Sequence, residues 1–147
     1  MARPAIPLPP ARGSLLALLA TSATLAIAGC GGDDKTADRR SGDETSVRRV
    51  LSDLQAAAVA GDGKRICTQI FTPKLAQSVA TSAKSGSCPE EVLRNLFSPA
   101  TKLTVQRVTV ADEANATATV KEATGEISTI FFVRQSGRWR IRSVQPA

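Results

Sequence analysis

The hydrophobic pattern of the chain changes its period near Pro99, and this change restricts the fold more than any other feature. Before Pro99, apolar residues recur every three or four positions, which is the spacing of one face of a helix. After Pro99, apolar and polar residues alternate, which places successive side chains on opposite faces of a strand. A run of helices followed by a run of strands is typical of α+β folds. We therefore expect helices packed on a four-stranded antiparallel sheet.

Capping residues divide the first half into four expected helices. Gly61 stands where a C-terminal cap belongs, and Asp62 can cap a short second helix. Thr72-Pro73 has the form of an N-cap followed by proline at the first helical position. Pro89-Glu90-Glu91 places two acids at the positive end of a fourth helix. The apolar stripe of the first helix consists of Val47, Val50, Leu51, Leu54 and Ala58.

Turn residues divide the second half into four strands, which predicts an antiparallel meander. Asp112-Glu113 and Ser136-Gly137 form two of the turns, and a change of face near Gln106-Arg107 indicates a bulge. The third strand is apolar on both faces, so one face should meet the helices and the other a ligand, a partner or a second copy. The expected strands cover residues 103–110, 114–120, 126–134 and 138–144. In the third strand, one face carries Ile130 and Phe132, and the other face carries Ile127, Phe131 and Val133.

The last strand carries three arginines on one face, which are a candidate contact for an anion: Arg138, Arg140 and Arg142. Guanidinium groups donate hydrogen bonds in a bidentate fork that fits phosphates and carboxylates. The alternative is that these arginines form a solvated stripe of charge that protects the sheet edge. Trp139 and Ile141 lie on the opposite face, where Trp139 is expected to anchor the core.

The N-terminal segment has the parts of an export leader. Arg3 and Arg12 supply positive charge, and the apolar stretch of residues 15–27 is shorter than the roughly 20 residues of a transmembrane helix. The segment ends in Ile27-Ala28-Gly29-Cys30, which resembles the lipobox of a bacterial lipoprotein. The resemblance implies that residues 1–29 are a signal peptide, that Cys30 is acylated, and that the protein is held by lipid on the extracytoplasmic face of the cell membrane. Plain secretion and an uncleaved anchor are the alternatives.

Two further segments follow from this cleavage. Residues 30–43 comprise the lipidated cysteine and a polar stretch that we expect to be a flexible tether, because it contains almost no apolar side chain. Residues 44–147 form the folded domain. Loss of the leader removes two arginines and no acid, so the net charge falls from +6 to +4. Scattered basic residues and few aromatic ones argue against a nucleic-acid partner.

If Cys30 carries lipid, Cys67 and Cys88 remain as a pair. An oxidising compartment favours a structural disulfide between them. A redox pair or a metal site is the alternative, but the chain has no C-x-x-C spacing and no histidine, so no metal site is expected.

The order of helices and strands, with Gly137-Arg138-Trp139-Arg140-Ile141 in the closing strand, resembles the nuclear transport factor 2-like superfamily. Small exported actinobacterial proteins with a turn like Gly61-Asp62, a cysteine pair and a "GRW" strand are also similar. The resemblance implies that helices pack into the concave face of a curved sheet, as a cone. It also implies dimerisation through the outer sheet face, or a small apolar ligand in the cone.

Enzymes of this superfamily use tyrosine, histidine and carboxylic acids, and the chain has neither histidine nor tyrosine. We therefore expect no catalytic residue and no cofactor. The expected function is a membrane-anchored, non-catalytic binding or accessory module. The alternatives are an isomerase-like or cyclase-like enzyme and a self-associating structural protein of the envelope. The acids expected at helix ends, polar faces and turns are Asp53, Asp62, Glu90, Glu91, Asp112, Glu113 and Glu126.

Overall fold

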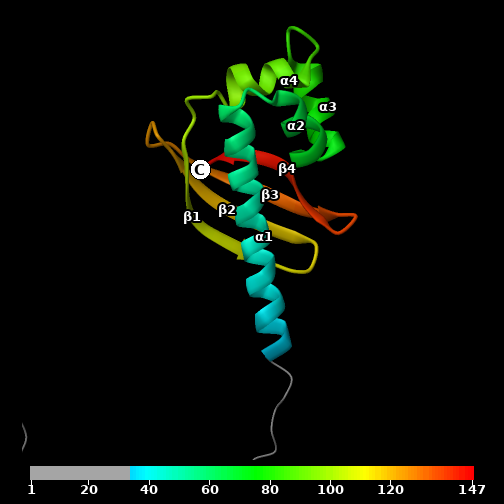
Figure 1. Ribbon diagram of the computed structural model, residues 1–147, viewed down its shortest axis with the longest axis vertical. Helices are drawn as coiled ribbons and strands as arrows, with labels where there is room; N and C mark the ends of the chain where they lie inside the picture. Colours follow the sequence, from blue (N-terminus) through cyan, green and yellow to red (C-terminus); the bar gives the residue numbers. More distant parts are fainter. Residues whose placement is uncertain (1–33) are drawn as a thin grey trace, which may run out of the picture. The chain divides into compact units, whose positions relative to one another are not determined.

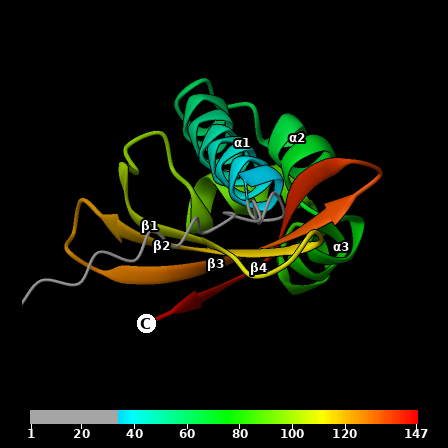
Figure 2. The ribbon, with the colours of Figure 1, turned by 90° about the horizontal axis from the view of Figure 1, so that it is seen from below.

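The computed structural model describes residues 34–147, which belong to one compact unit, Gly31–Ala147. A long helix, α1 (Asp34–Val59), crosses one face of a four-stranded sheet (Figure 1). Figure 2 shows the sheet edge-on, with α1 and α2 (Gly63–Arg65) on the same side of it. The α+β class predicted from the change of period is confirmed. Cys30 and the leader lie outside the described residues.

The sheet is an antiparallel meander, as predicted, in the order β1-β2-β3-β4. A shift of register between Val105 and Arg107 confirms the bulge expected in the first strand. A second shift was not expected. Phe131 pairs with Ser143, whereas Phe132 pairs with Ile141, so the fourth strand holds one additional residue there. The strand bounds are β1 (Leu103–Val110), β2 (Asn115–Glu122), β3 (Ile127–Gln135) and β4 (Arg138–Pro146).

The prediction of a flexible tether through residue 43 is wrong for the described part of that segment, because α1 already begins at Asp34. Two long-range ion pairs hold this arm of the helix to the sheet. Arg39 contacts Glu113, and Asp43 contacts Arg134. Moreover, the arm extends a helix that the core already stabilises, so the arm forms without the cost of nucleating a new helix.

The capping residues act as the sequence predicts. Gly61 has a φ of +67° just beyond α1, a conformation that favours glycine. The Asp62 side chain accepts a hydrogen bond from the backbone N–H of Arg65, and Thr72 accepts one from that of Leu75 at the start of α3 (Pro73–Ser82).

The expected second and fourth helices are each a short α-helix that continues into a π-helical turn. α2 continues over Ile66–Ile70, and α4 (Cys88–Glu91) continues over Val92–Leu96. Each π turn ends at a buried phenylalanine, Phe71 or Phe97, and the two rings meet edge to face at 6.4 Å between centroids. Trp139 is also buried, at 5% exposure, so aromatic rings fill the space between helices and sheet.

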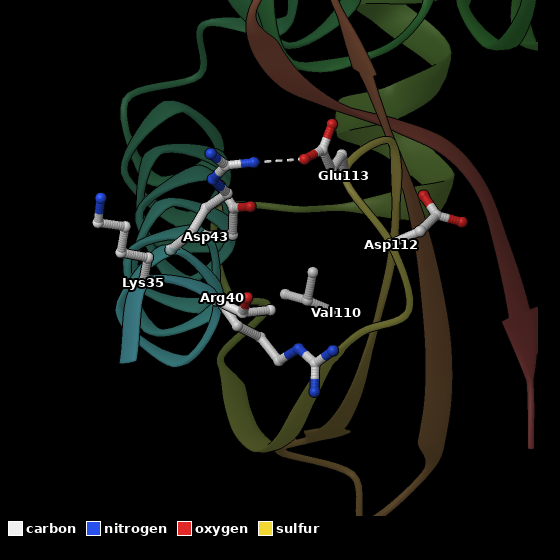
Figure 3. A pocket seen from close by; sticks show the side chains of 8 residues that line it. Lys35, Arg40, Asp43, Val110, Asp112 and Glu113 are labelled. Atoms are coloured by element: carbon white, nitrogen blue, oxygen red, sulfur yellow. Dashed lines mark hydrogen bonds and ion pairs between the residues drawn. The ribbon is translucent and has the colours of Figure 1, made fainter. Parts of the chain in front are cut away.

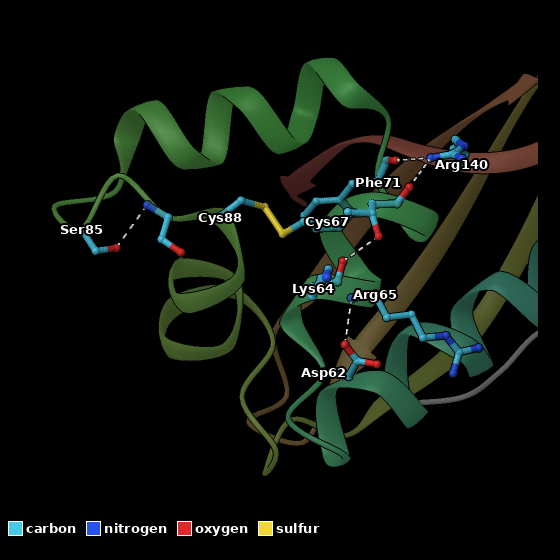
Figure 4. The surroundings of a disulfide bond; sticks show 10 residues. Asp62, Lys64, Arg65, Cys67, Phe71, Ser85, Cys88 and Arg140 are labelled. Carbon is cyan, nitrogen blue, oxygen red and sulfur yellow. Dashed lines mark hydrogen bonds between the residues drawn. A yellow bond between two sulfur atoms is a disulfide. The ribbon is translucent and has the colours of Figure 1, made fainter.

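A disulfide bond joins Cys67 in the first π turn to Cys88 at the start of α4 (Figure 4). The two Cα atoms are 6.3 Å apart, which is within the range of native disulfides. The same two segments also meet at Gly63, where a Cβ atom would overlap the backbone carbonyl of Pro89. The predicted cysteine pair is therefore present, and it fastens two helical segments that lie close together.

Candidate functional site

A cavity of about 330 Å³ opens between α1, the segment after it and the β3–β4 hairpin. Three elements therefore contribute side chains to one site. Most of the charged side chains that line it are arginines. We call this site the arginine pocket and define it by Arg49, Asp53, Arg65, Arg134, Arg138 and Trp139.

Local structure explains how each arginine reaches the pocket. Arg49 is exposed on α1, one position before the half-buried Val50. Arg65 ends α2, and its Nη2 lies 3.1 Å from the Asp53 carboxylate. Arg138 is the first residue of β4, directly after the Ser136-Gly137 turn. The tight hairpin thus brings Arg138 to the same cavity as the helical arginines.

The buried Trp139 and the half-buried Arg134 form one wall of the pocket. The Arg134 guanidinium carbon lies 4.5 Å from the centre of the Trp139 ring, a cation–π contact. The guanidinium also forms an ion pair with Asp43, which is only 9% exposed. Two buried donors of this wall, Nε of Arg134 and Nε1 of Trp139, have no acceptor among residues 34–147.

The pocket is positively charged. Four arginines and one aspartate line it, and a second aspartate, Asp43, reaches Arg134 from the far side. Two positive charges therefore remain after the aspartates are counted. A cleft lined by one sign of charge concentrates field and attracts ligands of the opposite sign.

A second cavity, of about 220 Å³, lies under the N-terminal arm of α1 (Figure 3). Basic and acidic residues line it in equal number, so it has no excess charge. Arg39 and Glu113 pair across its opening. The ionisable residues that line it are Lys35, Arg39, Arg40, Asp43, Asp112 and Glu113.

Asp112 in this second cavity is suited to hold a turn rather than to transfer protons. Its carboxylate accepts hydrogen bonds from the backbone N–H of Ala114 and from the side chain and backbone of Asn115. These bonds, with that of Ala114 the strongest influence, hold the pKa of Asp112 below its ordinary value. A general acid needs the opposite shift at neutral pH.

The structure does not bring the three predicted arginines of β4 into one site. Only Arg138 lines the arginine pocket. Arg140 donates to the carbonyl oxygens of Thr68 and Phe71, at 2.9 and 3.0 Å (Figure 4). Arg142 occupies the unexpected bulge, and its guanidinium lies 5.8 Å from the centre of the Phe131 ring. The bulge breaks the expected alternation at Arg142, whereas Arg138 and Arg140 precede it in regular register and differ in what their side chains contact.

Sequence reasoning missed Asp43, the most buried carboxylate among the described residues. Its position in a polar segment suggested coil, and its partner Arg134 is 91 residues away. Arg49 and Arg65 were also missed, since neither belongs to a motif. Only a prediction of how α1 packs on the sheet could have shown that these residues lie in the same site.

The outer face of β3 carries apolar side chains, as the alternation predicts. Phe131 and Val133 are half-buried there, and Ile127 is 40% exposed. Ile130 and Phe132 face the helices and are fully buried. Pairing of the outer face with a second copy stays a prediction.

No protein-family model matches the sequence, and no curated protein or solved structure is significantly similar to it. Within residues 34–147, no helix combines the length and the apolar character needed to cross a bilayer. The same residues contain no group of three side chains that could hold a metal ion. Inference about function therefore depends on the chemistry of the described cavities.

Proposed function

We propose that the protein is a lipid-anchored, extracytoplasmic lipoprotein whose domain binds an anionic ligand in the arginine pocket without transforming it. The observation that carries this proposal is the excess of arginine in a cavity with a buried aromatic wall. Guanidinium groups stay charged at every physiological pH and donate paired hydrogen bonds to carboxylate and phosphate oxygens. Anion binding is the chemistry that such a lining supports best.

The carboxylates near the pocket support a binding role over catalysis. Asp53 pairs with Arg65, and Asp43 pairs with Arg134. Each of these carboxylates is therefore engaged by an arginine side chain instead of being directed at a ligand. The chain also has neither the histidine nor the tyrosine that enzymes of the resembled superfamily use for proton transfer beside carboxylic acids.

The proposal also includes the fold family of the domain and the cellular compartment of the protein. Helices on one face of an antiparallel meander, together with the Gly137–Ile141 motif, support a nuclear transport factor 2-like cone. The residues before Cys30 support export and acylation. A disulfide between Cys67 and Cys88 is consistent with an oxidising compartment.

Loss of either unpaired arginine is expected to weaken anion binding by about tenfold to a hundredfold, because a hydrogen bond to a charged group contributes about 1.5–3 kcal/mol. The variants are R49Q and R138Q, and the matched control is R48Q, which makes the same charge change one position away on α1. Calorimetric titration at low salt with sulfate, citrate and phenyl phosphate measures the effect. If none of these anions binds the wild type, or if R48Q loses as much affinity as R49Q, the proposal is wrong.

Replacement of Cys30 by serine is expected to abolish acylation and release the protein from membranes. Two acyl chains give stable anchoring at about 0.8 kcal/mol per buried CH₂, whereas the unacylated domain has no such anchor. Labelling with radioactive palmitate and membrane fractionation measure both effects, with C67S as the control that keeps the label. An intact leader and an unmodified Cys30 in the native protein would contradict the lipoprotein assignment.

A further inference from the structure

We infer that the ligand of the arginine pocket is a doubly charged oxyanion of the phosphate monoester class. The inference rests on the proposed anion-binding function and adds to it the charge and chemical class of the ligand. Three features of the pocket lead to it: two unpaired guanidinium groups, their origin in two separate elements, and a small, partly apolar cavity.

The first feature is the number of unpaired positive charges. Asp53 neutralises Arg65 and Asp43 neutralises Arg134. Neither Arg49 nor Arg138 forms an ion pair with any residue in the described part of the chain. A ligand with two negative charges neutralises both guanidinium groups, whereas a single carboxylate or a sulfate ester leaves one guanidinium group without a counter-charge.

The second feature is the direction from which donors come. Arg49 belongs to α1, and Arg138 begins β4, so two separate elements supply the free guanidinium groups. A phosphate monoester has three terminal oxygens in a tetrahedral arrangement, and each accepts hydrogen bonds. Such a group can accept hydrogen bonds from both arginines at once.

Trp139 and Arg134 form the wall behind these two arginines. Nε1 of Trp139 and Nε of Arg134 are closed off from solvent and have no acceptor within residues 34–147, so a ligand in the cavity does not contact them. The polar contacts to the ligand therefore come from Arg49 and Arg138.

The third feature is size and lining. A volume of about 330 Å³ is near the lower end of ligand cavities, which span about 300–1,000 Å³. Val50 and Ile70 also line it. A phosphate group with a small organic substituent fits this combination, because the substituent can contact the apolar side chains while the phosphate contacts the arginines.

The decisive experiment compares phenyl phosphate with phenyl sulfate, which has nearly the same shape and one charge fewer. The binding unit is Gly31–Ala147, which contains the whole hydrophobic core. At pH 8 we expect phenyl phosphate to bind at least tenfold more tightly. As the pH falls to 5.5, phenyl phosphate takes up a proton near pH 6, and its affinity should approach that of the sulfate.

The protein offers a clean background for this pH profile. The chain has no histidine, and Cys67 and Cys88 are joined in a disulfide. The ionisable groups that face the ligand are those of the arginine pocket together with Asp43. Phenyl sulfate stays singly charged over the whole range, so any change in its affinity measures titration of the protein and can be subtracted.

Variants separate this inference from the proposed function. R49Q and R138Q should reduce the affinity for phenyl phosphate more than that for phenyl sulfate, whereas R48Q should change neither. Equal affinity for phosphate and sulfate esters, with no change across pH 6, would overturn the inference of a doubly charged ligand and leave the proposal of anion binding intact. Absence of binding by either ester would overturn both proposals.

A phosphate monoester occurs both in small metabolites and in the headgroup of phosphatidate. Glycerol 3-phosphate tests the first source, and vesicles containing phosphatidate test the second, with phosphatidylglycerol vesicles as the diester control. Binding of either one that R138Q weakens supports the inference and names the source. Failure of both, or equal binding to the diester vesicles, contradicts it.

Discussion

Replacement of both Cys67 and Cys88 by alanine is expected to lower the free energy of unfolding by about 3 kcal/mol. The bond closes a loop across a sequence separation of 21, and the entropy lost by the unfolded chain gives this magnitude. Both residues are buried, at 7% and 6% exposure, so lost packing adds to the effect. Urea unfolding followed by circular dichroism measures the change.

Reduction provides the control for the cysteine variant. A thiol reductant should lower the stability of the wild-type unit by a similar amount and leave the double alanine variant unchanged. The bond fastens the π turn after α2 to α4, while α3 and its N-cap lie within the closed loop. A wild-type protein whose unfolding curve does not respond to reductant would contradict a stabilising bond.

Local chemistry explains which parts of the fold the sequence predicts. Thr72-Pro73 and Asp62 cap their helices through bonds that span three residues, and Ser136-Gly137 turns the last hairpin with two positive φ angles. The bulge near Gln106 follows from a visible change of face. In each case the residues that decide the structure are neighbours in the chain.

The missed features depend on contacts between distant residues. The arm of α1 is held by ion pairs that span 74 and 91 positions, and no local pattern marks them. The bulge at Arg142 arises where β4 pairs with β3, so Arg142 departs from the expected stripe of arginines. The arginine pocket likewise joins α1, α2, β3 and β4, and of its arginines only Arg138 was predicted to contact an anion.

Replacement of Asp43 by asparagine is expected to lower the free energy of unfolding by about 2 kcal/mol. Breaking a buried ion pair costs about 3–5 kcal/mol, and an exposed pair contributes about 0–1 kcal/mol. The side chains of Arg134 and Asp43 are 28% and 12% exposed, which places this pair between the two limits. The matched control is D38N, an exposed aspartate five positions earlier on α1, for which a change below about 0.5 kcal/mol is expected.

The same substitution should move stability and ligand affinity in opposite directions. D43N removes a negative charge behind Arg134, so three positive charges face the ligand in place of two, and phenyl phosphate should bind severalfold more tightly. R134M removes the cation itself and should weaken binding, and the double variant D43N/R134M should recover part of the lost stability because no unpaired charge is left in the wall. Calorimetry and urea unfolding on the four proteins give both quantities. If D43N weakens phosphate binding as much as R134M does, Asp43 serves only to hold the wall in place, and its charge has no effect on the ligand.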